Sequence, residues 1–149
     1  MIVGDGAERP ALQAQVSALG LGPRVRFAGT QQDVVPWLRA LDVFALPSYA
    51  FEGVPQALLQ AMAVGIPCVT TDAGAIGEIA IADTTAVVVA KQNAVALAAG
   101  IERLLAAPPL RARLTWAARE RIQSKFGIGA MLDAMEAVLR RAADGNRYR

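Results

Sequence analysis

Residues 46–67 constrain this chain more than any other segment, because a short apolar run is followed there by a turn and then by a helical pattern. The turn holds one acid, Glu52. Pro55 predicts the start of a helix over 55–64, and Gly65 predicts its end. The first N–H groups of such a helix have no intrahelical acceptor and lie at its positive end, so they suit a phosphate or diphosphate. The segment therefore predicts a strand, an anion-binding loop and a helix, with a carboxylate beside the anion site.

A carboxylate and a phosphate repel each other, so Glu52 needs a different partner at such a site. A sugar bound between the two explains both features, since backbone amides then hold a diphosphate while Glu52 accepts hydrogen bonds from sugar hydroxyls. A simpler interpretation is also open. An acid just ahead of a helix stabilises the helix dipole by about 0.3–1 kcal/mol without any ligand.

Short apolar stretches alternate with helical patterns along the rest of the chain. This alternation predicts an α/β fold with a doubly wound, Rossmann-like parallel sheet and helices on both faces. Ligands bind such sheets beyond the carboxyl ends of the strands. We expect strands at 2–3, 25–27, 43–46, 68–70 and 86–89, and helices near 10–19, 33–40, 55–64, 76–81, 97–105, 110–122 and 132–139.

The chain has 149 residues, 54% of them hydrophobic, which suffices for one domain with its own core. We expect a single domain over 1–149, with a Rossmann-like core over 1–126 and a C-terminal helix and basic tail over 127–149. Histidine is absent and Cys68 is the only cysteine, which excludes histidine-based catalysis, disulfides and cysteine-rich zinc sites. The single cysteine, with no secretory signal and no apolar run of about 20 residues, predicts a cytoplasmic location.

Charge is unevenly spread along the sequence. Residues 101–149 contain ten Lys and Arg against five Asp and Glu, although the net charge of the whole chain is only +2. The C-terminal arginines either contact an anionic membrane surface at the inner face of the cell membrane or lie in water as ordinary helix ends. Nucleic acid is not an expected partner, because aromatic residues are only 5% of the chain and no nucleic-acid motif occurs.

Further motifs accompany the 46–67 segment in a fixed order and spacing. They are Ile2-Val3-Gly4-Asp5-Gly6, Val25-Arg26-Phe27-Ala28-Gly29, Asp42-Val43-Phe44-Ala45-Leu46-Pro47-Ser48 and Pro67-Cys68-Val69-Thr70-Thr71-Asp72-Ala73-Gly74, followed by Glu78. With these motifs the chain resembles the retaining glycosyltransferases of family 4, the group 1 family of sugar-nucleotide enzymes. The resemblance covers roughly residues 1–126.

This resemblance implies the C-terminal, donor-binding half of a GT-B architecture, whose N-terminal domain binds the acceptor. Family members open this half with another strand–helix unit that carries a basic pair for the diphosphate. Met1 runs directly into a strand close to its glycine turn, so we expect that first unit to be missing. We expect the fragment alone to be inactive, with the missing N-terminal acceptor-binding domain as its partner in the full-length enzyme.

The resemblance also assigns roles to individual residues. Glu52 becomes the catalytic-site acid that contacts the hydroxyls of the donor sugar. Gly53, Val54 and Gln56 offer backbone amides to the diphosphate. The donor-binding set implied in this way is Gly4, Gly6, Thr30, Gln31, Ser48, Gly53, Val54, Gln56 and Gln60, in which Gly4 and Gly6 allow close approach and Thr30 and Gln31 lie where the nucleobase binds.

Two positions depart from the family pattern. The family has a second acid eight positions after the first, where it accepts hydrogen bonds from the ribose, and this chain has Gln60 there. Glutamine still accepts through its amide oxygen, at a loss on the order of 1 kcal/mol, or it is a plain surface residue of the helix. Ala75 replaces a second glycine after Gly74, which puts any contact that needs glycine there in doubt. We expect Glu78 to cap and charge the start of a helix.

These residues predict a transferase that moves a sugar from a nucleotide-diphosphate sugar to an acceptor hydroxyl with retention of configuration, in bacterial cell-envelope polysaccharide or glycolipid synthesis. No cofactor and no metal are expected, because amides and basic side chains neutralise the leaving diphosphate. A non-catalytic nucleotide-sugar-binding or scaffold module is the alternative. The donor base, the sugar and the acceptor stay open.

Overall fold

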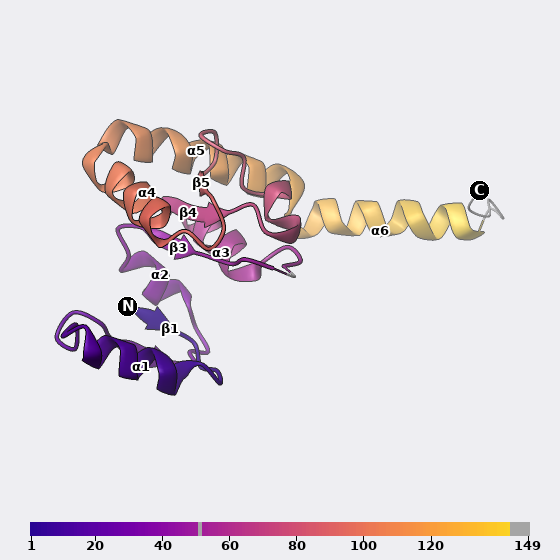
Figure 1. The fold of residues 1–149 in the computed structure, drawn as a ribbon. Coiled ribbons are helices and arrows are strands. Elements are labelled where there is room, and N and C mark those ends of the chain that lie inside the picture. Colours follow the sequence, from indigo (N-terminus) through magenta and orange to yellow (C-terminus); the bar gives the residue numbers. More distant parts are fainter. Residues whose placement is uncertain (51, 144–149) are drawn as a thin grey trace. The chain divides into compact units, whose positions relative to one another are not determined.

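The computed structural model describes residues 1–50 and 52–143 of the chain (Figure 1). Strands and helices alternate, and every ladder between the described strands is parallel. The α/β class with parallel pairing is therefore confirmed. The described strands form two ladders, one of two strands and one of three. The chain also divides into two compact units, Met1–Ala40 and Leu41–Arg149.

The first unit contains the two-stranded ladder. Strands β1 (Ile2–Val3) and β2 (Phe27–Gly29) pair in parallel and are joined through helix α1 (Arg9–Ala18). Pro10, in the first turn of α1, lacks the N–H that would find no acceptor there, so it suits the start of this helix. Helix α2 (Val35–Arg39) ends this unit.

The second unit is built on strands β3 (Phe44–Leu46), β4 (Cys68–Thr71) and β5 (Val87–Val89), with β4 in the centre. All four residues of β4 are buried, which is why this strand reads as a continuous run of small, mostly β-branched residues. Helix α3 (Gln56–Val64) connects β3 to β4 and packs against both strands.

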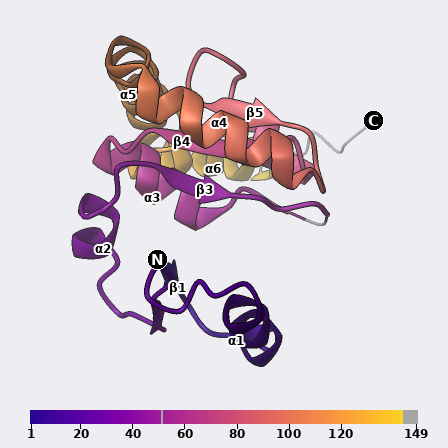
Figure 2. The ribbon, with the colours of Figure 1, turned by 60° about the vertical axis from the view of Figure 1, so that its left-hand side comes forward.

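The remaining helices of this unit follow β5. Helix α4 (Ala94–Ala106) lies along β4 and β5, as Figure 2 shows, and α5 (Pro108–Lys125) packs against α3 and α4. Pro108 and Pro109 follow the end of α4 and open α5, where a proline fits the first turn of a helix. A core cluster joins the sheet to these helices through Val69, Val87, Leu104 and Leu114. The expected strands and long helices are confirmed to within a few residues.

One expected helix has a different form. The segment after β4 is a 3₁₀ helix, η1 (Gly74–Glu78), rather than an α-helix over 76–81. Glu78 lies at the end of η1 and not at its start, so the predicted capping role of Glu78 is wrong. Its backbone carbonyl instead accepts hydrogen bonds from the guanidinium of Arg121 on α5. The short 3₁₀ form follows from its two glycines, which disfavour a longer helix.

Helix α6 (Ile128–Ala143) has no buried residue. Its large apolar side chains are at least 44% exposed, and they include Met131, Leu132, Met135, Val138 and Leu139. None of the helices within residues 1–50 and 52–143 combines the length and the apolar character needed to cross a membrane.

Candidate functional site

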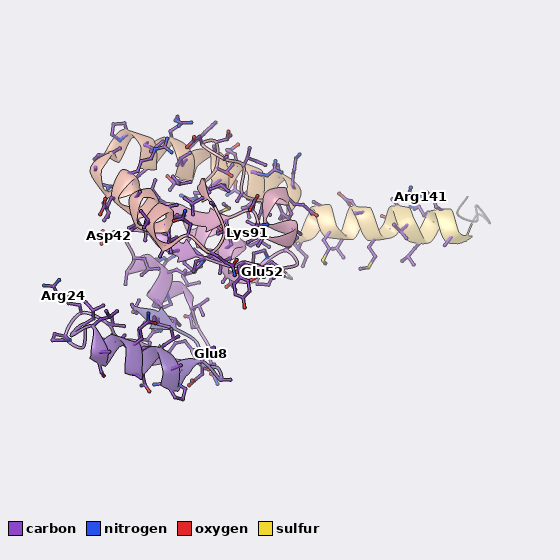
Figure 3. The ribbon with its side chains drawn as sticks, in the orientation of Figure 1. Glu8, Arg24, Asp42, Glu52, Lys91 and Arg141 are labelled. Carbon is purple, nitrogen blue, oxygen red and sulfur yellow. The ribbon has the colours of Figure 1, made fainter. Side chains whose placement is uncertain are left out.

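The loop after β3 holds the acid that the sequence singles out. Glu52 is half-buried, and the hydroxyl of Ser48 donates a hydrogen bond to its Oε1 at 2.5 Å. The hydroxyl of Thr71, at the end of β4, donates in turn to the backbone carbonyl of Ser48. Figure 3 shows Glu52 and Asp42 at opposite ends of the second unit's β3. The carboxylate therefore lies beyond the carboxyl end of its strand, where parallel sheets bind ligands.

Gly74 packs directly against the backbone of Glu52 in the same loop. Its φ is +53°, and a Cβ placed on it would lie 2.0 Å from the backbone oxygen of Glu52. The N–H of Ala75 donates to that same oxygen at 3.0 Å. Only glycine allows this contact, because a side chain at position 74 would occupy the space of the Glu52 peptide. The contact that needs glycine is thus made by Gly74, and Ala75 contributes only its backbone.

The start of α3 follows directly. Pro55 is the N-cap residue in an extended conformation, and no side chain caps the helix. The first backbone bonds of the helix run from Leu58 and Leu59 to the Pro55 carbonyl, so the N–H groups of Gln56 and Ala57 have no intrahelical acceptor. Both residues are exposed, and a Cβ on exposed Gly53 would meet no atom within 4 Å. An open, electropositive helix end therefore lies next to the Glu52 loop.

Gln60 lies on the exposed side of α3, one turn after its start, whereas Leu58, Ala61 and Met62 are buried against the sheet. Side chains of a helix lean towards its N-terminus. Gln60 is thus available to a ligand at that end of the helix. Its carboxamide offers an uncharged acceptor and a donor, while an acid at this position would add a second negative charge.

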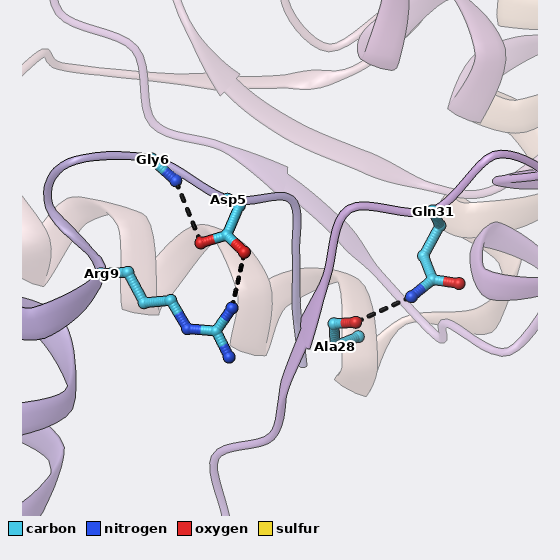
Figure 4. A network of polar contacts seen from close by, with 5 residues as sticks. All are labelled: Asp5, Gly6, Arg9, Ala28 and Gln31. Carbon is cyan, nitrogen blue, oxygen red and sulfur yellow. Dashed lines mark hydrogen bonds and ion pairs between the residues drawn. The ribbon is translucent and has the colours of Figure 1, made fainter.

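The other predicted donor-binding residues belong to the first unit (Figure 4). The N–H of Gly4 donates to the Gly29 carbonyl at 2.8 Å, and the φ of Gly4 is +122°. The side-chain amide of Gln31 donates to the Ala28 carbonyl at 2.7 Å. Thr30 is exposed. The loops after β1 and β2 are thereby brought together within this unit.

The loop after β1 also contains an ion pair. Asp5 accepts a hydrogen bond from the Gly6 N–H at 3.3 Å and pairs with Arg9 at 2.7 Å. The Arg9 guanidinium lies 6.0 Å from the centre of the Phe27 ring. The Arg9 guanidinium therefore contacts both the Asp5 carboxylate and the Phe27 ring on β2, and these two contacts order the loop after β1.

Two other titratable side chains, Lys91 and Cys68, take part in structural contacts. Lys91, after β5, pairs with Asp72, after β4, at 3.5 Å, and both side chains are exposed. Cys68 is fully buried at the start of β4, and its burial raises the pKa of the thiol from 9.0 to about 12. The thiol is therefore neutral and unreactive at neutral pH, and Cys68 acts as a small residue of the core.

With this geometry in place, comparison with known proteins identifies the family. The model of the family "Glycosyl transferases group 1" matches residues 1–107. The chain belongs to this family. It is 34% identical, over 133 residues, to the lipopolysaccharide core biosynthesis glycosyltransferase LpsE of Rhizobium meliloti (strain 1021). That alignment covers 89% of this chain and 39% of LpsE.

Solved structures agree on the fold. The C-terminal domain of a group 1 glycosyltransferase, LpcC of Francisella tularensis, is 28% identical with a TM-score of 0.70, over 80% of this chain and 63% of that one. HepE of Anabaena, solved in complex with UDP-glucose, has a TM-score of 0.87 at 24% identity, over 93% of this chain and 39% of HepE. The chain thus corresponds to the C-terminal domain of group 1 glycosyltransferases and spans less than half of LpsE and of HepE.

Sequence reasoning missed the residues that hold the Glu52 loop. In the sequence, Thr71 is one residue of the 67–74 motif, and Gly74 precedes Ala75, the position that departs from the family pattern. Neither residue was predicted to contact the Glu52 loop. A signal was present in the pair Thr70-Thr71 at the end of a buried strand, because buried hydroxyls need acceptors. Which carbonyls accept from them depends on how β3 and β4 pair, and the sequence does not contain that register.

Proposed function

We propose that this chain is the donor-binding half of a retaining glycosyltransferase that transfers a sugar from a nucleotide-diphosphate sugar to an acceptor hydroxyl. One observation carries the proposal: the Glu52 carboxylate is held by Ser48 beside the uncapped start of α3. A carboxylate and a bare helix start side by side suit a ligand with hydroxyls at one end and phosphates at the other.

In this proposal the diphosphate lies on the N–H groups at the start of α3, with the loop amides of Gly53 and Val54 next to it. The helix dipole stabilises the negative charge that grows on the leaving phosphate as the glycosidic bond breaks. Glu52 accepts hydrogen bonds from the sugar hydroxyls and so fixes the orientation of the sugar over the diphosphate. No metal or other cofactor takes part in this scheme.

Retention of configuration follows if the acceptor attacks the same face that the diphosphate leaves. The leaving phosphate then takes the proton of the acceptor hydroxyl, and no side-chain base is needed. This fits a chain without histidine, in which Glu52 contacts the sugar rather than the attacking oxygen. Gln60 accepts from the ribose, and a contact of Thr30 and Gln31, in the first unit, with the nucleobase stays an expectation from the family resemblance.

The acceptor is proposed from the relatives. LpsE is described as a lipopolysaccharide core biosynthesis enzyme, and we extend this cell-envelope setting to the present chain. Such an acceptor lies at the cytoplasmic face of a membrane. The exposed apolar side chains of α6, with Arg140 and Arg141 in its last turn, provide a surface for peripheral contact with anionic lipid. The acceptor-binding domain belongs to the rest of the full-length protein.

A non-catalytic nucleotide-sugar-binding module is the second candidate, and Gln60 favours it. An amide in place of a carboxylate weakens a charge-assisted hydrogen bond to the ribose. The same change removes a negative charge near the diphosphate, which offsets part of that loss. The two candidates share the binding site and differ in turnover.

Calorimetry on the full-length protein tests the proposal. UDP, GDP, UDP-glucose and GDP-mannose are titrated into the wild type and into Glu52→Gln. We expect Glu52→Gln to weaken the affinity for the sugar nucleotide about tenfold or more, through a lost charged hydrogen bond, and not to weaken the affinity for the nucleoside diphosphate. Asp42→Asn, at the other end of β3, is the matched control and should change neither.

A Glu52→Gln variant that binds and reacts as the wild type does contradicts a donor role for Glu52. Turnover separates the two candidates. A full-length protein that binds the sugar nucleotide but neither transfers nor hydrolyses it, with lipopolysaccharide-core acceptors present, is a binding module.

A further inference from the structure

We infer that Thr71 and Ser48 are positioning residues for Glu52, so that a buried hydroxyl on the central strand sets the place of the sugar-binding carboxylate. The inference rests on the proposed function, and in it Thr71 itself touches no substrate group. We call the three residues the Thr71–Ser48–Glu52 relay, because the hydroxyl of Thr71 donates to an oxygen of Ser48 and the hydroxyl of Ser48 donates to an oxygen of Glu52.

The relay begins in the rigid part of the molecule. Thr71 is 2% exposed and lies at the end of β4, which pairs with a strand on each side. Its hydroxyl donates to the Ser48 carbonyl, two residues beyond the end of β3. At Ser48 the β3–β4 ladder has already ended. The Thr71 hydroxyl therefore extends the pairing of the two strands into the loop.

Ser48, held by Thr71 through its carbonyl, in turn holds the carboxylate of Glu52 through its hydroxyl. Its hydroxyl donates to Oε1 of Glu52 at 2.5 Å, four residues further along the loop. Within the described residues Oε2 of Glu52 has no protein partner, so one carboxylate oxygen is held and the other remains for a ligand. A long acidic side chain loses rotamer freedom when it is ordered, and the relay removes that freedom before the donor binds.

The backbone of Glu52 is held separately. Its carbonyl lies against Gly74 and accepts from the Ala75 N–H at 3.0 Å. Glu52 is therefore fixed at two points, through its peptide by η1 and through its carboxylate by the relay. A variant in the relay should release the carboxylate while the backbone of the loop stays in place.

Thr70 provides a matched comparison inside the same strand. It is 0% exposed, and its hydroxyl donates to the Leu46 carbonyl at 3.0 Å. Leu46 belongs to β3 and is already paired with β4 through the ladder. Thr70 and Thr71 thus make the same kind of buried bond, but only the bond of Thr71 reaches the loop that contains Glu52.

The experiment uses the full-length protein and calorimetric titration with UDP, GDP, UDP-glucose and GDP-mannose. For the base that the protein prefers, the ratio of the affinity for the sugar nucleotide to the affinity for the nucleoside diphosphate gives the gain in affinity due to the sugar. We expect Thr71→Val and Ser48→Ala to reduce this gain about tenfold, and Thr71→Val to leave the affinity for the nucleoside diphosphate unchanged. Thr70→Val, which loses an equivalent buried hydroxyl, should leave the gain intact. Thr71→Ser keeps the hydroxyl and should restore it.

Three outcomes overturn the inference. Thr70→Val has the same effect as Thr71→Val, or the affinity for the nucleoside diphosphate falls in parallel, or Thr71→Ser fails to restore the gain. Each would show that the buried hydroxyl only stabilises the fold.

A double-mutant cycle separates this inference from the proposed function. In the Glu52→Gln background, Thr71→Val should cost nothing more, because it acts through the carboxylate that is already gone. Additive losses overturn the relay while the donor role of Glu52 stands. If Glu52→Gln itself leaves the gain unchanged, or if the wild type binds none of the four probes, both the proposed function and the relay fail.

Discussion

The loops after β1 and after β3 both follow a parallel strand and both contain an acid and glycine, yet they are held in different ways. In the first, Asp5 contacts Gly6 and Arg9, one and four residues away. In the second, Glu52 and Ser48 are held by Thr71, Gly74 and Ala75, more than 20 residues away. The acid of the first loop is held by residues of its own loop and of the helix that follows, and the acid of the second by residues at the end of β4 and in η1.

The difference has a functional consequence. An acid held by local contacts can be ordered or released without disturbing the sheet, whereas an acid held from a buried strand shares the rigidity of the core. The acid proposed to bind the sugar lies on the second kind of loop. Precise placement of one carboxylate favours this arrangement, because binding groups on rigid supports keep their geometry better.

The largest effect is expected from Gly74→Ala. The new Cβ would lie 2.0 Å from the Glu52 oxygen and would also require φ of +53° from a residue that avoids it. We expect a loss of about 3 kcal/mol in the free energy of unfolding, or a displaced loop with loss of sugar-nucleotide binding. Urea unfolding and calorimetry measure the two. Gly77→Ala, in the same 3₁₀ helix but with no atom within 4 Å of its Cβ, should stay within about 0.5 kcal/mol of the wild type.

The next effect comes from the buried thiol of Cys68, in the same strand β4 that holds the second loop. Burial raises the pKa of its thiol from 9.0 to about 12, so between these values the unfolded chain loses a proton that the folded chain keeps. Stability from this group is therefore complete below pH 9.0 and falls as pH rises, by up to about 1.4 kcal/mol per pH unit. Urea unfolding on either side of that pH, compared with Cys68→Ala, measures the effect. A wild type and a Cys68→Ala variant with the same pH dependence would contradict it.

Gly4→Ala sharpens the comparison between the two loops. Gly4 has a φ of +122°, but a Cβ there would meet no atom within 4 Å. We expect a loss of about 1 kcal/mol, due to backbone strain alone. Thermal unfolding measures it against Gly74→Ala. Equal losses in the two variants would mean that contact with Glu52 adds nothing to the cost at position 74.

The smallest effect is expected from Asp5→Asn. The Asp5–Arg9 pair is short but partly exposed, at 47% and 35%. Exposed pairs four residues apart contribute little, so stability should change by less than about 0.5 kcal/mol. Thermal unfolding at low and high salt measures this. A larger change that persists in high salt would show that this loop, too, depends on more than a local ion pair.

Much of the fold could be predicted from residue patterns. The apolar stretches predicted the five strands of the described residues, and Pro55 and Gly65 predicted the ends of α3. The segment after β4 was predicted less well, because its two glycines leave the backbone undecided between α and 3₁₀ forms until it packs against the loop of Glu52. The predicted roles of Glu52, Gln60 and the donor-binding residues remain predictions for the experiments above to test.

Taken alone, the order of residues determined the strand–helix alternation, the family and the presence of one acid ahead of an uncapped helix, because periodicity, prolines and short motifs act over a few neighbours. It contained no sign that Thr71 would reach Ser48 or that Gly74 would lie under Glu52. Those contacts exist only once β3 and β4 pair in register, which brings together residues 22 and 23 positions apart. The acid was visible from the start, while its support came from packing between strands.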